Sequence, residues 1–244
     1  AAGDAAPDRI ALLGHALRHG RLTVAEELLA LAPPLAPEER AQALLAAAAA
    51  PDASLAWMAD RLDAIEPLLP EGKPLLAGLL EARPLPFAAI RALLARGTPA
   101  GGALFVPLFE AAYAAPDAQR AEFESLALAL LERGADPFAR DRHGRHALHE
   151  AASLRAPRLF GTLLARGLDP NAADQRGRTP LHELAALPEE QAVPLAQALL
   201  LAGADPERTA ADGQTPLGAA LAAGRAQLVR WLSWVGPFRH PGRA

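Results

Sequence analysis

The stretch "DQRGRTPLHELAA", Asp174–Ala186, decides the fold, because its pattern occurs twice more in the chain. The other copies are "DRHGRHALHEAAS" at Asp141–Ser153 and "AADGQTPLGAALA" at Ala210–Ala222. All three place Gly fourth and Leu eighth, and their starts lie 33 and then 36 residues apart. A period of this length indicates a repeat protein, whose units bury their apolar surfaces by stacking on one another.

The copies carry signals for helix starts and helix ends. A Thr–Pro pair stands at Thr179-Pro180 and at Thr215-Pro216. The Thr hydroxyl can bind free amides at a helix start, and Pro in the first turn loses no hydrogen bond. Leu-rich runs are followed by glycines that favour a left-handed helix end, at Gly134, Gly167 and Gly203. The pattern therefore predicts two helices in each repeat.

These residues resemble the ankyrin repeat. The resemblance is carried by Thr179-Pro180-Leu181-His182, by Thr215-Pro216-Leu217, and by the helix endings Gly134-Ala135-Asp136, Gly167-Leu168-Asp169 and Gly203-Ala204-Asp205. It implies an all-α ankyrin-repeat solenoid of about seven stacked helix pairs joined by short hairpin loops.

The resemblance also suggests how the chain is organised. We expect divergent repeats over 1–100, clear repeats with a C-terminal cap over 101–236, and a tail at 237–244, in one continuous solenoid. One of the divergent helix pairs is predicted at 36–65. Trp231 and Trp234 lie in the last predicted helix, where we expect them to cover the end of the stack.

Three evenly spaced histidines, His143, His146 and His149, raise the alternative of a metal-dependent enzyme. A metal needs three or four converging ligands, whereas these side chains are expected on a loop tip and at a helix start. The resemblance implies that His149, like His182, is structural and hydrogen-bonds between neighbouring repeats. His146 stands where the family has Thr, and it can still accept an amide hydrogen bond there.

The composition argues against several other classes of protein. The formal net charge is −4, with 24 basic and 28 acidic residues, whereas nucleic-acid binding usually shows as a strongly basic balance. The chain has no cysteine, which removes disulfides and thiolate metal sites. It also lacks an apolar run of about 18 residues, a phosphate-binding glycine loop and a catalytic serine motif. We therefore expect no catalytic residue, no cofactor and no membrane span.

The resemblance implies that a protein partner would contact the hairpin tips and the first helix of each pair, on the concave side. Aligning the repeats gives the candidate contact residues Phe105, Tyr113, Arg142, His143, Arg145, Ser153, Leu154, Gln175, Arg176, Arg178, Asp212 and Gln214. Arginine is concentrated in the middle tips, and Arg and aromatic side chains often anchor interfaces. The hypothesis is an acidic protein surface or loop as partner; the alternative is solvated charge on an Arg-rich chain.

The function that these observations favour is a non-catalytic protein-binding module, used as an inhibitor, immunity protein or adaptor, with a toxin or effector as one kind of partner. The alternative is the targeting domain of a larger effector or enzyme. A single lysine among the basic residues, with abundant Arg, Ala, Gly and Pro, suggests a bacterial source. We expect the bacterial cytoplasm, or the periplasm if the Ala-rich start follows a cleaved signal peptide.

Overall fold

The computed structural model describes residues 8–31, 75–82 and 85–235, together with isolated positions between 35 and 58. Over these residues the chain is helical and contains no β-strand, so the predicted all-α class is confirmed. The predicted tail at 237–244 lies outside the described residues, and so does most of the predicted helix pair at 36–65.

The chain forms two compact units. Unit 1 spans Ala1–Ala115 and Ser125–Ala135, and unit 2 spans Pro116–Glu124 and Asp136–Ala244. Helix α8 (Arg120–Glu132) contributes to both, because its first turn belongs to unit 2 and its remainder to unit 1. The predicted division near residue 100 within one continuous solenoid stays a prediction.

Unit 1 contains the described helices of the predicted divergent repeats, together with α7 (Phe105–Ala114) and most of α8. The helices of the predicted divergent repeats are α1 (Arg9–Arg18), α2 (Leu22–Ala30), α5 (Leu75–Glu81) and α6 (Phe87–Ala95). Helix α1 packs against α2, and the Arg9 guanidinium donates to the carbonyls of Leu28 and Leu31 at 2.8 and 2.9 Å. Helix α5 packs against α7. Helices α1 and α2 therefore form a helix pair at the start of the described chain.

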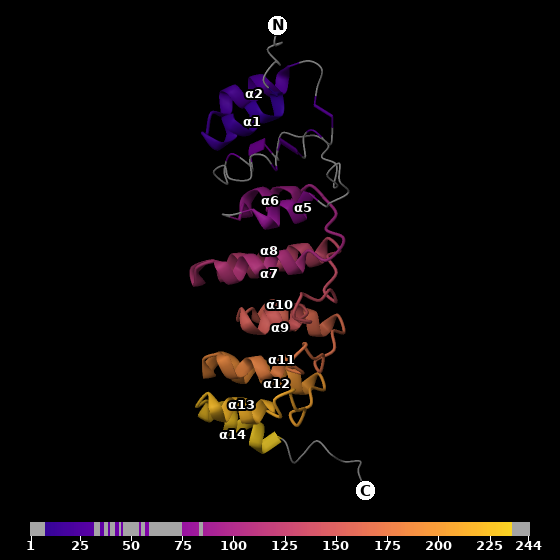
Figure 1. Cartoon of the computed structure of the whole chain (residues 1–244), viewed down its shortest axis with the longest axis vertical. Helices are drawn as coiled ribbons and strands as arrows, with labels where there is room; N and C mark the ends of the chain where they lie inside the picture. Colours follow the sequence, from indigo (N-terminus) through magenta and orange to yellow (C-terminus); the bar gives the residue numbers. More distant parts are fainter. Residues whose placement is uncertain are drawn as a thin grey trace. The chain divides into compact units, whose positions relative to one another are not determined.

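Unit 2 contains the clear repeats, and its helix pairs follow one another in chain order (Figure 1). The elements are η1 (Asp117–Gln119), α9 (Ala147–Ser153), α10 (Pro157–Ala165), α11 (Pro180–Glu183), η2 (Leu184–Ala186), α12 (Glu189–Leu201), α13 (Pro216–Ala222) and α14 (Ala226–Val235). The first helices α9, α11 and α13 contact one another in order, and so do the second helices α10, α12 and α14. Unit 2 is thus a stack with two helical layers.

The core of unit 2 lies between these layers. Leucines at matching positions of successive repeats, Leu148 and Leu181 on the first helices and Leu163 and Leu199 on the second, are at most 1% exposed. Burying a leucine side chain contributes on the order of 2 kcal/mol, so each pair is stabilised chiefly by its neighbours.

The predicted helix ends are present. Helices α8, α10 and α12 end two residues before Gly134, Gly167 and Gly203, which all adopt positive φ. The amide that follows each glycine reaches back to the last turn, as in the 2.9 Å bond from Ala204 N to the Leu199 carbonyl. This geometry satisfies helical carbonyls that would otherwise lack a donor.

The hairpin loops of unit 2 are closed by an aspartate and joined to one another by backbone hydrogen bonds. Asp174 Oδ1 accepts from the amides of Arg176 and Arg178 at 2.8 and 2.9 Å, and Asp141 does the same in the preceding loop. Between loops, Gln175 N donates to the His143 carbonyl at 2.9 Å, and Ala211 N donates to the Arg176 carbonyl at 2.7 Å. Each loop is therefore fixed in register with the next.

The predicted role of Trp231 at the end of the stack stays a prediction. Trp231 is half-buried in α14 and, with Val193 of α12, lines a recess of about 580 Å³. Its ring therefore lies near the preceding second helix. The Trp234 side chain lies outside what the structure describes.

Gly177 gives a test of the link between loops. It has φ +73°, and a Cβ there would lie 3.0 Å from Ala211 N, the amide that bonds to Arg176. Gly203 has φ +97°, but a Cβ there would meet no atom within 4 Å. We expect Gly203→Ala to lower the free energy of unfolding by about 1 kcal/mol through backbone strain alone. Gly177→Ala should lower the free energy of unfolding, measured in urea, by clearly more than Gly203→Ala does. Equal losses in the two variants would contradict the link between the loops.

Candidate functional site

Two buried histidines connect successive repeats. The Nε2 atoms of His149 and His182 lie 3.1 Å from the carbonyl oxygens of Arg178 and Gln214, each in the loop of the following repeat. A carbonyl oxygen only accepts, so each Nε2 carries the proton and donates. Both side chains are fully buried. The structural role that the sequence predicted for these two histidines is present in the geometry.

Thr179 and His182 satisfy each other at the start of α11. His182 Nδ1 accepts from Thr179 N at 3.0 Å and lies 3.0 Å from Thr179 Oγ1. Because His182 Nε2 holds the imidazole proton, Nδ1 is an acceptor and the Thr hydroxyl donates to it. A hydroxyl suits this position because it can donate and accept at once.

The His146 ring nitrogen at the start of α9 cannot both accept from a helix amide and donate to His149. His146 Nδ1 accepts from Leu148 N at 3.1 Å, so the imidazole proton is on Nε2. His146 Nε2 is buried and has no hydrogen-bond partner among the described residues. Its Nδ1 also lies 3.4 Å from Nδ1 of His149, which is itself an acceptor. The predicted cap is formed, but it leaves two lone pairs facing each other and one N–H unsatisfied.

The three buried histidines are held in the neutral form. Burial, together with the proximity of His149 and Arg140, lowers the pKa of His146 to about 4, and burial lowers the pKa of His149 to about 4. Burial also lowers the pKa of His182, against the opposing effect of its bond to the Gln214 carbonyl. At neutral pH these imidazoles therefore act as uncharged hydrogen-bonding groups.

Glu183 of α11 lies between two arginines, Arg145 and Arg178, and forms an ion pair with each. Its Oε1 lies 3.3 Å from Arg178 Nε, and its Oε2 lies 3.7 Å from Arg145 Nη2. Arg145 Nη2 also donates to Ser153 Oγ at 2.7 Å. Arg145 and Glu150, like Arg178 and Glu183, are five residues apart and lie 3.3 Å apart. This network spans two repeats.

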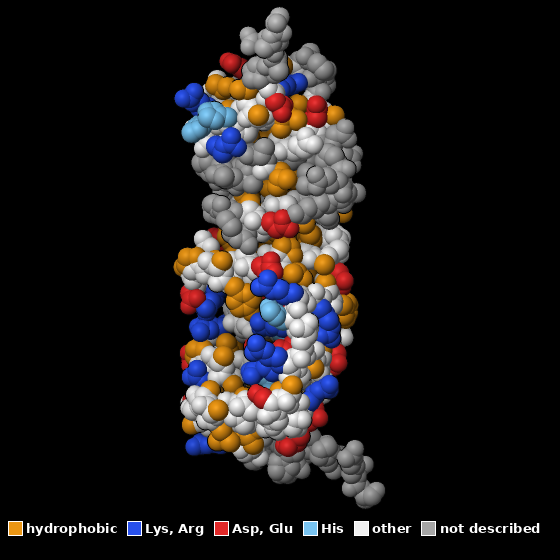
Figure 2. Space-filling model, in the orientation of Figure 1, with side chains coloured by type: hydrophobic (Ala, Val, Ile, Leu, Met, Phe, Trp, Pro, Cys, Tyr) orange, Lys and Arg blue, Asp and Glu red, His pale blue; other side chains and the backbone are white. Residues whose placement is uncertain are grey.

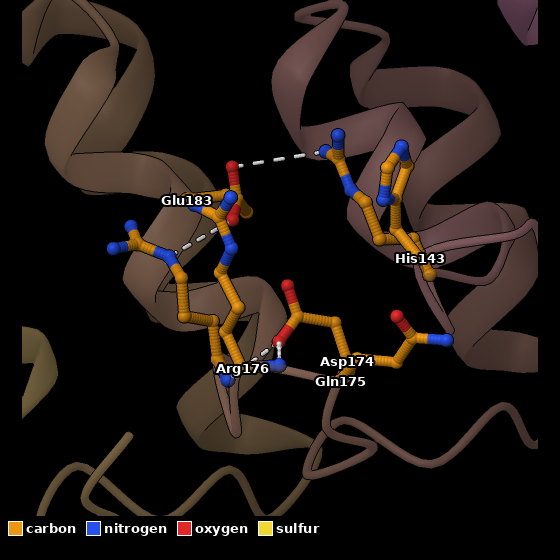
Figure 3. Close-up of a pocket in the computed structure, with 7 residues that line it drawn as sticks. His143, Asp174, Gln175, Arg176 and Glu183 are labelled. Atoms are coloured by element: carbon orange, nitrogen blue, oxygen red, sulfur yellow. Dashed lines mark hydrogen bonds and ion pairs between the residues drawn. The ribbon is translucent and has the colours of Figure 1, made fainter. Parts of the chain in front are cut away.

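These charges border a recess of about 370 Å³ between two successive hairpin loops (Figure 3). Its lining residues are His143, Arg145, Asp174, Gln175, Arg176, Arg178 and Glu183. Glu183 and His143 lie on opposite sides of the recess, with Asp174, Gln175 and Arg176 on the loop between them (Figure 3). Figure 2 shows arginine side chains gathered around a histidine over helices α9 to α11.

The five arginines near the loops fall into two groups. Arg145 and Arg178 are half-buried in the network, and Arg140 Nη1 donates to the carbonyls of Gly144 and Ala173. Arg142 and Arg176 are exposed, and neither forms an ion pair with a described residue. Arg142 Nε donates to His143 Nε2 at 3.1 Å, and Arg176 uses only its backbone. Two guanidiniums are therefore available to a partner.

The structure divides the other candidate contact residues by exposure. The side chains of Phe105 and Leu154 are 1% and 8% exposed. They are core residues, so the prediction that they contact a partner is wrong. Tyr113 is 52% exposed but belongs to unit 1. Ser153 is half-buried and bound to Arg145. The exposed candidates in unit 2 are Arg142, His143, Gln175, Arg176, Asp212 and Gln214.

Several polar residues of unit 2 were not predicted from the sequence. Glu183 is one, because its role depends on two arginines from different repeats. Glu124 accepts from Arg158 N at 2.7 Å, and Glu189 accepts from Gln227 N at 2.8 Å, so each caps the second helix of the next pair. The 33-residue recurrence of Arg-x₄-Glu at Arg145 and Arg178 is the one sequence signal that could have identified the network.

The described residues contain no group of three or more His, Cys, Asp or Glu side chains that could hold a metal ion. His149 Nε2 is occupied by its bond to the next loop, and His143 lies on the loop surface. The three evenly spaced histidines therefore do not converge. Among the described helices, none is both long and apolar enough to span a membrane.

Comparison with known families identifies the repeat. Residues 176–210 match the family model of the ankyrin repeat, a segment that includes α11 and α12. A search of curated proteins gave no match. The chain therefore contains an ankyrin repeat over residues 176–210, and its described residues are all-α, as the sequence predicts. Ankyrin repeats are in general protein–protein interaction modules and are typically non-catalytic.

His146 gives a test of the cap. We expect His146→Thr to raise the free energy of unfolding by about 1 kcal/mol, because a hydroxyl can accept from the helix amide and donate to His149. The reverse change in the next repeat, Thr179→His, should lower it. Urea unfolding of both variants checks this. A His146→Thr protein no more stable than the parent would contradict the hydrogen-bond assignment.

The lowered pKa values predict an acid-sensitive fold. Above pH 6.5 the histidines are neutral in the folded and unfolded chain, so their contribution is constant. Between pH 6.5 and about 4 the unfolded chain binds protons that the folded chain does not. Stability should therefore fall with falling pH, by up to about 1.4 kcal/mol per pH unit for each histidine. Urea midpoints at pH 7, 6 and 5 test this, and His146→Thr should flatten the decline.

Proposed function

We propose that this protein is a non-catalytic binding module whose loop surface in unit 2 recognises an acidic surface or loop of another protein. The observation that carries the proposal is the pair Arg142 and Arg176, exposed on successive loops and without a carboxylate partner among the described residues. The chain as a whole is acidic, with a net charge of −4, so this cationic surface departs from its average.

Several features support recognition through this surface. Arginine and neutral hydrogen-bonding side chains occur together, because His143, Gln175 and Gln214 are also exposed on the same loops. Arg can bind a carboxylate through two parallel hydrogen bonds, which adds geometric selectivity to charge attraction. The backbone bonds between loops fix the spacing of these side chains before a partner arrives, and such preorganisation reduces the entropy cost of binding.

Within this class we propose an inhibitor, immunity or adaptor role, in which binding alone produces the effect. The ankyrin family supports this, because its members typically act by binding proteins. A toxin or effector with an acidic active-site rim is one partner that such a surface would fit. The second candidate is a targeting domain of a larger effector or enzyme, which would use the same surface to locate its substrate.

The proposal predicts that reversing the charge of the two exposed arginines abolishes recognition. The protein with Arg142→Glu and Arg176→Glu should bind its partner more weakly by about 2 kcal/mol or more, because both groups would then repel an acidic surface. The experiment is affinity capture from native cells followed by calorimetry with the captured protein. Arg158→Glu with Arg208→Glu is the matched control, because these arginines are also exposed in unit 2 but lie away from the recess.

A captured protein that binds the parent and the control equally well, but not the Arg142/Arg176 variant, would support the proposal. Unchanged affinity of that variant would overturn it. Circular dichroism should show that both double variants keep the helical content of the parent, because all four side chains are exposed.

A further inference from the structure

Arg176 is the one arginine that lines the recess without a carboxylate partner among the described residues. Arg145 is paired with Glu150 and Glu183, and Arg178 is paired with Glu183. The ionised lining groups are three guanidiniums, of Arg145, Arg176 and Arg178, and two carboxylates, of Asp174 and Glu183. Asp174 Oδ1 already accepts from two backbone amides of its own loop. The guanidinium of Arg176 is therefore available to a ligand.

Arg178 supplies a second, oriented donor group. Its Nε bonds to Glu183 Oε1 and its Nη2 to the His182 carbonyl, both at 3.3 Å. These bonds leave its Nη1 without a partner among the described residues and hold the planar guanidinium in place. A guanidinium held in this way loses less side-chain entropy on binding than a freely rotating one.

We propose that this recess binds a single carboxylate group of the partner protein, with Arg176 as its main ligand and Arg178 as its second. This inference rests on the proposed function and names the group that the surface recognises. A volume of about 370 Å³ admits the end of an Asp or Glu side chain, or the carboxylate at a chain terminus. His143 and Gln175 line the same recess as neutral hydrogen-bonding groups.

The two carboxylates that line the recess also select against a phosphate. A phosphate monoester carries about −1.5 to −2 at pH 7, so it would add excess negative charge beside Asp174 and Glu183. Arginine sites often bind phosphate. The two carboxylates that line this one therefore favour a ligand with a single negative charge.

The test is a titration of the full chain, followed by the NMR signals of the arginine Nε–H groups. The probes are N-acetyl-glutamate α-amide, which has one side-chain carboxylate, N-acetylglycine, which mimics a chain terminus, and N-acetyl-phosphoserine amide. We expect the signals of Arg176 and Arg178 to shift and saturate with at least one of the carboxylate probes. The phosphoserine probe should bind at least threefold more weakly at pH 7.

Matched variants separate this site from general attraction to arginine. Arg176→Gln should weaken carboxylate binding at least tenfold and should fold normally, because the side chain is exposed. Arg208→Gln removes an equally exposed arginine outside the recess and should leave binding unchanged. Equal shifts at Arg208 and Arg176, or tighter binding of phosphoserine, would overturn the inference. Binding of only one carboxylate probe identifies whether a side chain or a terminus enters.

Partner capture with the variants distinguishes failure of the carboxylate site from failure of the proposed function. If the captured partner is lost with the Arg142/Arg176 charge reversal but binds the Arg176→Gln protein as tightly as the parent, the surface is used without the carboxylate site. In that case the inference is wrong while the proposed function stands. If the charge reversal leaves capture intact, the proposed function is wrong, whatever the probes show.

Discussion

The hydrogen bond from a buried imidazole to the carbonyl of the next loop is the interaction on which unit 2 depends. His149 and His182 make this bond at the same distance, 3.1 Å, in successive repeats. A buried imidazole N–H without an acceptor would cost on the order of 1–3 kcal/mol, so each first helix determines where the following loop lies. Burial of the leucines holds the pairs together, and these directional bonds set their register.

That register determines the direction of each loop arginine. Arg145 and Arg178 both stand four residues after the aspartate that closes the loop, and both turn towards the carboxylate on the following helix. Arg142 and Arg176 stand nearer the tip and point to solvent. The third repeat has Gln214 and Ala219 where the others have Arg and Glu, so the charged network ends there. The cationic surface is therefore confined to the first two loops.

Local sequence rules predicted most of this fold. The glycine helix ends, the Thr215 cap and the structural role of His149 and His182 each depend on one repeat and its immediate neighbour. The candidate site was predicted less well, because exposure depends on stacking. Phe105 and Leu154 align with contact positions of the family but are buried by their surroundings in this chain. The sharing of Glu183 by two arginines appears only when two repeats are placed side by side.

The two loops that border the recess are anchored unequally. In the second, His182 Nδ1 accepts from Thr179 at the helix start, and His182 Nε2 donates to the Gln214 carbonyl. In the first, His146 leaves one buried N–H unsatisfied and faces the acceptor nitrogen of His149. A sequence that breaks a local rule in this way commonly does so near a functional site. The stability lost through the unsatisfied N–H of His146 is lost at the base of the loop that carries Arg142 and His143. The loop with Arg176 and Arg178 therefore begins its helix with a fully hydrogen-bonded cap, whereas the loop with Arg142 and His143 begins its helix with a cap that leaves one buried N–H without an acceptor.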